Sequence, residues 1–276
     1  EISVRDWSSD VCSSDRVVIA GAGWIGLEVA AAARARGCAV TVVEPAPTPL
    51  HVPLGPEMGG FFAELHRDHG VDFRLGSGVT GFQGNGSVSE VATTDGSILP
   101  ADTVIIGVGA RPNTELAEQA GLTIDDGIVV DATLRSDDPD IYAAGDVAAV
   151  PSTHYGRRIR VEHWANAIGG GQAAAKAMLG MAITYDELPY FFSDQYDIGM
   201  EFSGWFPLGG YDQVITRGDV EGHSFHAFWL AGKHVVAGMH DNRWNDGIGE
   251  VQDLIRSRQP IEVDLLAAAL DRKSVV

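Results

Sequence analysis

A glycine-rich turn between two apolar segments most constrains the fold of this chain. Residues 16–45 read RVVIAGAGWIGLEVAAAARARGCAVTVVEP. Residues 17–20 predict a short buried strand, and an alanine-rich helix is expected to run to about Arg36, before Gly37. Residues 39–44 predict a second strand that ends in Glu44. The order strand, glycine turn, helix, strand predicts the first unit of a Rossmann-like, parallel α/β domain.

The spacing of the glycines predicts a dinucleotide site. Gly21, Gly23 and Gly26 form G-x-G-x-x-G. In this pattern the first glycine permits a tight turn, the second lets the backbone approach a pyrophosphate, and the third allows close helix–strand packing. The N-terminus of the helix that follows is then expected to face the pyrophosphate with unpaired N–H groups and a positive dipole end.

The acidic residue after the second strand indicates which dinucleotide binds. Glu44 stands 23 residues after Gly21, where a carboxylate bonds the ribose 2′-hydroxyl. A carboxylate there repels a 2′-phosphate, and no arginine follows it, so NADH is favoured over NADPH. From this turn alone FAD stays an alternative ligand, and the motifs further along the chain decide for NAD.

A second turn, in residues 141–148 (IYAAGDVA), predicts a flavin site. Asp146 follows a buried strand directly after Gly145, where the backbone can approach a ligand closely. Such a site needs a second glycine-rich turn near the start of its own domain. We expect that turn to lie upstream of Arg16, outside the sequence.

Both ends of the chain differ in character from the rest. Residues 1–15 (EISVRDWSSDVCSSD) and 271–276 (DRKSVV) resemble the translation of a common short-read sequencing adapter. We therefore expect two non-native tails on an N-terminally truncated chain, and exclude them from reasoning about the fold. The alternative is an ordinary disordered tail at each end.

Several later segments resemble the two-dinucleotide flavoprotein reductases. They are DTVIIGVGARPNTEL (102–116), the IYAAGDVA turn and LPYFFSDQYD (188–197). The third is similar to a segment of the FAD/NAD(P)-dependent ferredoxin and rubredoxin reductases of oxygenase electron-transfer chains. The resemblance covers residues 16–270. It implies an α/β fold with a Rossmann-like NAD-binding domain (16–113), the second part of an FAD-binding domain (114–187) and a small α+β C-terminal reductase domain (188–270).

The resemblance also implies site residues. It adds Glu28, expected to face the nicotinamide amide, and Gly109 to the NAD set. Phe192 stands where the family usually has Trp near the flavin. No protein side chain is expected to be catalytic, because the flavin carries the chemistry, and no metal is expected. The implied NAD residues are Gly21, Gly23, Trp24, Ile25, Gly26, Glu28, Glu44 and Gly109, and the implied FAD residues are Gly145, Asp146, Glu162, His163, Trp164 and Phe192.

The implied function is transfer of hydride from NADH to FAD, then of single electrons to a ferredoxin or rubredoxin that feeds an oxygenase. Two alternatives remain: an NADH oxidase or nitrite-reductase-type flavoprotein on the same scaffold, or, for the truncated chain, a non-catalytic NAD-binding module. The absence of a C-x-x-C motif in the NAD module argues against a thioredoxin reductase.

The composition of the chain limits the kinds of partner that it is expected to bind. A net charge of −19 argues against nucleic-acid and anionic-membrane binding, and no apolar run reaches the length of a membrane span. Two cysteines in no metal or redox spacing fit the cytoplasm, with Cys38 as a core residue. Arg157, Arg158 and Arg160 form a basic cluster that is either a docking site for an acidic ferredoxin or, more simply, a solvated loop. His66 and His69 are expected to be exposed helix residues.

Overall fold

A computed structural model describes residues 15–268, so residues 1–14 and 271–276 of the two expected tails lie outside the described residues. The described chain divides into two compact units. The first comprises residues up to Ala110 together with Ser193–Ile198, and the second comprises Arg111–Phe192 and the residues from Gly199 onward. The domain boundaries expected at residues 113 and 187 stay predictions.

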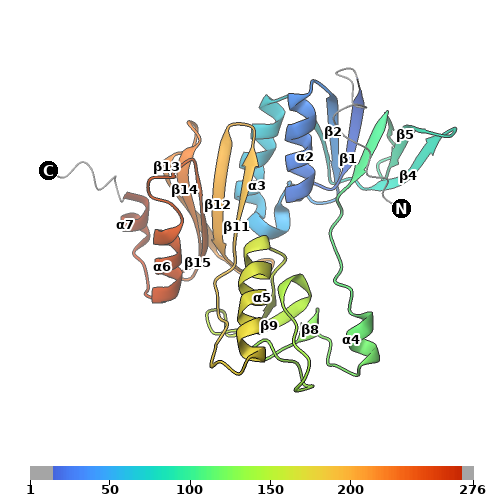
Figure 1. Ribbon diagram of the computed structural model, residues 1–276. Helices are drawn as coiled ribbons and strands as arrows, with labels where there is room; N and C mark the ends of the chain where they lie inside the picture. Colours follow the sequence, from blue (N-terminus) through green and yellow to red (C-terminus); the bar gives the residue numbers. More distant parts are fainter. Residues whose placement is uncertain (1–14, 269–276) are drawn as a thin grey trace. The chain divides into compact units, whose positions relative to one another are not determined.

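A parallel four-stranded sheet in the order β3-β2-β1-β7 forms the centre of the first unit. The helices α2 and α3 lie side by side along it, and the strands β4 and β5 lie on the other side (Figure 1). Val91 and Leu99 of the three-stranded sheet β4-β5-β6 pack with Val18 and Val43 of the parallel sheet. The elements of this unit are β1 (Arg16–Ala20), α2 (Trp24–Ala35), β2 (Ala39–Glu44), α3 (His51–Asp68), β3 (Val71–Leu75), β4 (Val79–Gly84), β5 (Val88–Thr93), β6 (Ile98–Pro100) and β7 (Thr103–Ile106).

The predicted βαβ unit is confirmed, with β1, α2 and β2 within a residue of their expected ends. The helix α3 contains one irregularity: Gly55 has φ 77°, and the regular helix continues from Pro56. Proline suits the first turn of a helix because its missing N–H would be unpaired there. The buried face of α3 includes Phe62 and Leu65, which anchor it on the sheet.

The second unit holds a small three-stranded sheet, β10-β9-β8, and a larger antiparallel sheet in the order β11-β12-β15-β14-β13. Figure 1 shows α5 beside β9, and α6 beside β15. The helix α6 packs so closely on the larger sheet that a Cβ at Gly238 would lie 2.7 Å from Val251. The elements of this unit are α4 (Glu115–Gln119), β8 (Ile128–Val129), η1 (Gly145–Val147), β9 (Ala148–Ser152), β10 (Arg157–Arg160), α5 (Trp164–Met178), β11 (Tyr190–Gln195), β12 (Ile198–Gly204), β13 (Gln213–Asp219), β14 (Ser224–Ala231), β15 (His234–Asp241), α6 (Gly249–Ser257) and α7 (Val263–Ala268).

Candidate functional site

The turn after β1 is built on two glycines that no other residue could replace. Gly21 has φ 101°, and a Cβ there would lie 2.3 Å from the carbonyl oxygen of Gly107. A Cβ at Gly26 would lie 2.1 Å from the carbonyl oxygen of Gly21. Both distances are far below van der Waals contact, so the turn and the first residues of α2 can approach each other only with glycine at these positions.

Gly23 plays a different part in the same turn. A Cβ at this position would have no atom within 4 Å, so protein packing does not explain the glycine. Gly23 is the N-cap of α2 without a side-chain cap, and the first turn of α2 carries no acidic residue. No side chain therefore caps the N-terminus of this helix, which is where the predicted pyrophosphate would bind. The side chain of Ile25 is 69% exposed beside this N-terminus, and Trp24 packs edge-on against Phe62 at 5.8 Å.

Glu44 lies beside the glycine turn at the carboxyl end of β2. Its Oε2 accepts a hydrogen bond of 2.7 Å from the N–H of Ala22, and its Oε1 accepts one of 2.9 Å from the N–H of Ala46. The pairing of β1 with β2 brings the carboxylate to the turn, because the carboxyl ends of parallel strands share one edge of a sheet. The carboxylate is thus fixed where a ribose beside the turn could reach it.

The loop after β7 borders the same turn. Gly109 has φ 107°, and a Cβ there would meet no atom within 4 Å. The neighbouring Ile106 and Val108 are 59% and 74% exposed. Exposed aliphatic side chains beside an open helix N-terminus suit the apolar faces of a dinucleotide.

Glu28 is the expected nicotinamide-facing residue, and it has a partner that the sequence did not predict. The Ser193 hydroxyl donates to Glu28 Oε1 at 2.7 Å, and Ser193 accepts a hydrogen bond of 3.0 Å from Gln195 Nε2. Gln195 Oε1 in turn lies 2.7 Å from His66 Nε2. Ser193 and Gln195 belong to the segment that clusters with the first unit.

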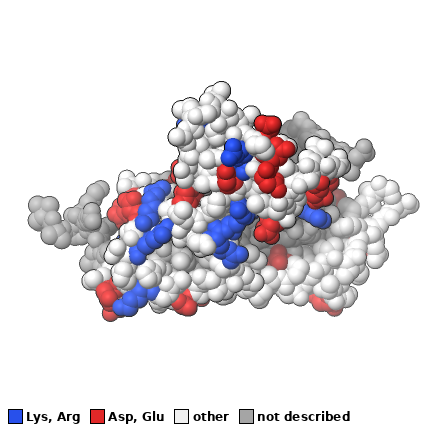
Figure 2. Space-filling view, turned by 90° about the horizontal axis from the view of Figure 1, so that it is seen from below, with Lys and Arg blue, Asp and Glu red and all other residues white. Residues whose placement is uncertain are grey.

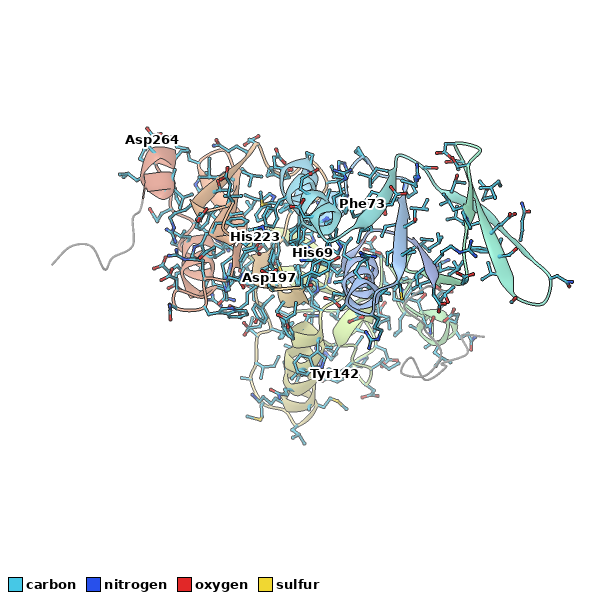
Figure 3. The ribbon with its side chains drawn as sticks, turned by 90° about the horizontal axis from the view of Figure 1, so that it is seen from above. His69, Phe73, Tyr142, Asp197, His223 and Asp264 are labelled. Carbon is cyan, nitrogen blue, oxygen red and sulfur yellow. The ribbon has the colours of Figure 1, made fainter. Side chains whose placement is uncertain are left out.

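The expectation that His66 is exposed is wrong. Its side chain is fully buried on α3, edge-on to Phe73 at 6.1 Å, and burial lowers its pKa to about 4. No local pattern predicts this burial, because the hydrogen-bond acceptor, Gln195, lies more than a hundred positions further along the chain. His69 is exposed, as predicted, and its ring stacks on Tyr196 at 3.7 Å. Figure 3 labels His69, Phe73 and Asp197, the last being the residue after Tyr196.

The expected flavin turn lies in the second unit. Gly145 begins η1 with φ 74°, and Asp146 behind it is exposed. A Cβ at Gly145 would touch Ala167 of α5 at 3.5 Å. Three consecutive glycines at 169–171 lie inside α5, yet the helix is continuous. A Cβ at Gly170 would lie 3.6 Å from Gly145 N, so this glycine brings the helix close to the turn.

Arg160 ties two of the expected flavin residues together. Its guanidinium Nη1 donates to the Asp146 carbonyl at 3.1 Å and to Glu162 Oε1 at 2.5 Å. Its Nε also lies 3.3 Å from Asp126. A single cation therefore binds both the backbone carbonyl of Asp146 and the carboxylate of Glu162.

The other two arginines of this cluster also have partners within the second unit. Arg158 donates to the carbonyl of Ala149 at 2.8 Å, and the Arg157 guanidinium lies 5.2 Å from the centre of the Trp205 ring. The three arginines of the cluster therefore interact with other residues of the second unit and do not form a simple solvated loop. On the face drawn in Figure 2, basic side chains form several separate groups with acidic side chains beside them.

His163, Trp164 and Phe192 mark the start of α5 and the strand β11. His163 is the N-cap of α5, half-buried, and burial lowers its pKa. Its ring stacks on Phe191 at 4.5 Å, and the expected flavin contact of the next residue, Phe192, stays a prediction. Adjacent residues of a strand point to opposite faces, and Phe192 is 51% exposed. Trp164 is 73% exposed, a large apolar surface at the predicted flavin turn.

The remaining candidate features contribute less to the argument about function. Cys38 is buried, as predicted, and burial raises the pKa of its thiol. Within residues 15–268 no group of three or more His, Cys, Asp or Glu side chains is arranged to hold a metal, and no helix is long and apolar enough to cross a membrane. A cavity of about 580 Å³ lies between α5 and α6, lined among others by Lys176, Tyr185 and Arg256, and its lining includes none of the expected flavin residues.

A glycine turn on a parallel sheet, a Gly-Asp turn against a helix and an antiparallel C-terminal sheet together define an α/β fold of the two-dinucleotide flavoprotein type. The chain belongs to the pyridine nucleotide-disulphide oxidoreductase family, whose model matches residues 3–181. A second model, that of the reductase C-terminal domain, matches residues 190–275.

Comparison with individual proteins shows which members of the family the chain is similar to. The chain is 38% identical to putidaredoxin reductase of Pseudomonas putida over 257 residues, which is 92% of this chain and 60% of the relative. It is 38% identical to rhodocoxin reductase of Rhodococcus erythropolis, over 83% of this chain and 53% of the relative. The crystal structure of a covalent putidaredoxin reductase–putidaredoxin complex superposes with a TM-score of 0.87 at 38% identity, covering 94% of this chain and 62% of that one. The predicted resemblance to ferredoxin reductases is confirmed, for a chain that spans about 60% of the length of the putidaredoxin reductase.

Proposed function

We propose that the chain is part of an NADH-dependent flavoprotein reductase that passes electrons to a ferredoxin or rubredoxin serving an oxygenase. The observation that carries the proposal is the arrangement of Gly23 and Glu44. Gly23 leaves the helix N-terminus without a side-chain cap, and the Glu44 carboxylate is fixed beside it by the N–H groups of Ala22 and Ala46. A pyrophosphate on the first and a ribose diol on the second would together hold NADH.

The residues of the second unit fit FAD. Gly145 at positive φ, the exposed Asp146 and the exposed Trp164 leave backbone, carboxylate and an aromatic face open around one turn. We infer that Asp146 bonds the ribityl hydroxyls and that Glu162, His163, Trp164 and Phe192 lie near the ring. When bound, FAD accepts a hydride and releases electrons singly, chemistry that no protein side chain supplies.

Within this scheme the described residues bind and orient. The start of α2 binds the pyrophosphate, Glu44 selects NADH against NADPH by repelling a 2′-phosphate, and Glu28 orients the nicotinamide amide. The relatives include putidaredoxin reductase and rhodocoxin reductase, which supports an iron–sulfur protein as the electron acceptor. We also propose a cytoplasmic location, because NADH is kept inside cells and Cys38 is a buried thiol.

The test uses the 276-residue chain. It is mixed with FAD, separated from unbound flavin and examined by visible absorption before and after anaerobic addition of NADH. A retained flavin band that bleaches with NADH, and ferredoxin reduction faster than oxygen consumption, would support the reductase. Faster oxygen consumption would favour the oxidase alternative.

Binding of NADH and NADPH is measured on the same preparation by calorimetry. Saturable NADH binding without retained flavin would reduce the chain to an NAD-binding module. An absence of NADH binding, or a preference for NADPH, would overturn the proposal at its first step.

A further inference from the structure

A row of hydrogen bonds runs through the first unit and ends on Glu28. The bonds join Tyr196 Oη to His66 Nδ1 (3.1 Å), His66 Nε2 to Gln195 Oε1 (2.7 Å), Gln195 Nε2 to Ser193 Oγ (3.0 Å) and Ser193 Oγ to Glu28 Oε1 (2.7 Å). The Rossmann-like fold does not need these side chains, since the sheet and helices are complete without them.

With a neutral His66, each bond in the row has one possible direction. The Glu28 carboxylate accepts only, so Ser193 donates its single proton there and must accept from the Gln195 amide. The amide oxygen then faces His66, whose Nε2–H donates to it and whose bare Nδ1 accepts from the Tyr196 hydroxyl. All four donors point toward the carboxylate. A neutral His66 is required, and its burial, which lowers the pKa to about 4, keeps it neutral near pH 7.

The middle of the row is buried. His66, Gln195 and Ser193 are 0%, 1% and 2% exposed, so water has little access to replace a lost bond. Aligned hydrogen bonds out of contact with water polarise one another, and removal of one leaves a buried polar group unpaired. The Glu28 carboxylate is therefore held in one orientation by a connected set of buried groups.

The turn that follows Gln195 is itself strained. Tyr196 has φ 57°, a left-handed conformation that aromatic residues seldom adopt. The stack of its ring on His69 at 3.7 Å and its hydrogen bond to His66 hold it there. Strained residues held by their surroundings are frequent at ligand sites.

We propose that Ser193 is a positioning residue for NADH: backed by Gln195 and His66, it orients the Glu28 carboxylate toward the nicotinamide amide. The proposal rests on the function proposed above, in which Glu28 meets the nicotinamide. In this proposal the 193–198 segment helps to bind the nicotinamide end of NADH. The glycine turn and Glu44 bind the ADP-ribose end.

The test compares two ligands on the full chain. NADH carries the nicotinamide and ADP-ribose lacks it, and both reach the glycine turn and Glu44. Ser193→Ala is expected to weaken NADH binding about tenfold and to leave ADP-ribose binding within twofold. Ser193→Thr, which keeps a hydroxyl, is expected to restore NADH binding. Ser89→Ala, in an exposed serine of β5, is the control that changes neither.

A double-mutant cycle separates positioning from damage to the fold. In a Glu28→Gln background, Ser193→Ala is expected to cost NADH little further affinity, because the carboxylate that it orients is gone. An undiminished loss in that background would overturn the proposal, as would equal losses for NADH and ADP-ribose or none for either. If the unmodified chain binds neither ligand, the proposed function fails instead.

Discussion

Gly26 lies so close to Gly21 that a Cβ at position 26 would stand 2.1 Å from the Gly21 carbonyl oxygen. This contact fixes the start of α2 against the end of β1. Gly23 lies between these two glycines, and a Cβ there would meet no atom within 4 Å, so packing does not require a glycine at this position. Stability and ligand binding can therefore be separated by substitutions at two neighbouring glycines.

Gly26→Ala is expected to destabilise the chain by roughly 2–4 kcal/mol, because the methyl group forces backbone apart from backbone. Gly23→Ala is expected to leave the thermal midpoint nearly unchanged and to weaken NADH binding, because its Cβ would enter only the open space before α2. Thermal unfolding and calorimetric titration of both variants check the pair. A similar loss of stability in the two would contradict the division of roles.

Glu44→Arg is expected to reverse the choice of dinucleotide. The substitution removes the carboxylate that the N–H groups of Ala22 and Ala46 hold and places a cation where a 2′-phosphate would lie. NADH binding should weaken at least about tenfold, or about 1.4 kcal/mol, while NADPH binding improves relative to it. Parallel titrations with the two nucleotides measure the change. Glu64→Arg, on the exposed side of α3, serves as the charge-matched control.

The buried His66 makes the free energy of unfolding depend on pH. Its folded-state pKa of about 4 lies below the usual 6.5, so the unfolded chain binds the proton more readily between these values. Its contribution to stability is present above pH 6.5 and is lost as the pH falls toward 4, which amounts to about 2 kcal/mol between pH 7.5 and 5. His66→Gln should lose this part of the pH dependence. Urea unfolding at the two pH values, with the exposed His234→Gln as control, measures it.

Asp241 has the opposite effect. The carboxylate is fully buried at the end of β15, opposite Met200 and Phe225, and no hydrogen-bond partner for either oxygen lies in the described part of the chain. Burial raises its pKa to about 7. The Asp241 carboxyl stabilises the fold at low pH, where it is protonated, and this stabilisation is lost as the pH rises through 7. The free energy of unfolding should therefore fall by roughly 2–3 kcal/mol between pH 5 and 8.

Asp241→Asn is expected to flatten that dependence and to make the chain relatively more stable at pH 8. Urea unfolding across this range, with the exposed Asp253→Asn for comparison, provides the check. An unchanged slope in the Asp241 variant would show that this carboxylate is not the source.

The sequence predicted those parts of the fold that depend on local chemistry. The boundaries of β1, α2 and β2 follow from a glycine turn and apolar periodicity, which act over a few residues. The continuity of α5 through three glycines was not predicted. Close packing offsets the weak helix propensity here, since a Cβ at Gly169 would lie 3.5 Å from the Tyr185 hydroxyl oxygen and one at Gly170 would lie 3.6 Å from Gly145 N.

The site divides in the same way. The positions of Gly21, Gly23, Gly26 and Glu44 could be predicted because one short motif contains them. The burial of His66 and the link from Ser193 to Glu28 could not, because each joins residues more than a hundred positions apart and no periodicity encodes such a pair. The contact between Phe191 and His163 was not predicted either, because adjacent residues of a strand point to opposite faces and the sequence does not show which of two phenylalanines faces His163.

The bond between Glu28 and Ser193 has a consequence for the order in which the protein is made. A ribosome that has synthesised the glycine turn, Glu28 and His66 has not yet made the serine and glutamine that complete their surroundings. The nascent first unit therefore holds an imidazole with no acceptor until the 193–198 segment emerges. Contacts so distant along the chain form late and slowly. The nicotinamide end of the site is thus expected to mature last, after the sheet that supports it is already in place.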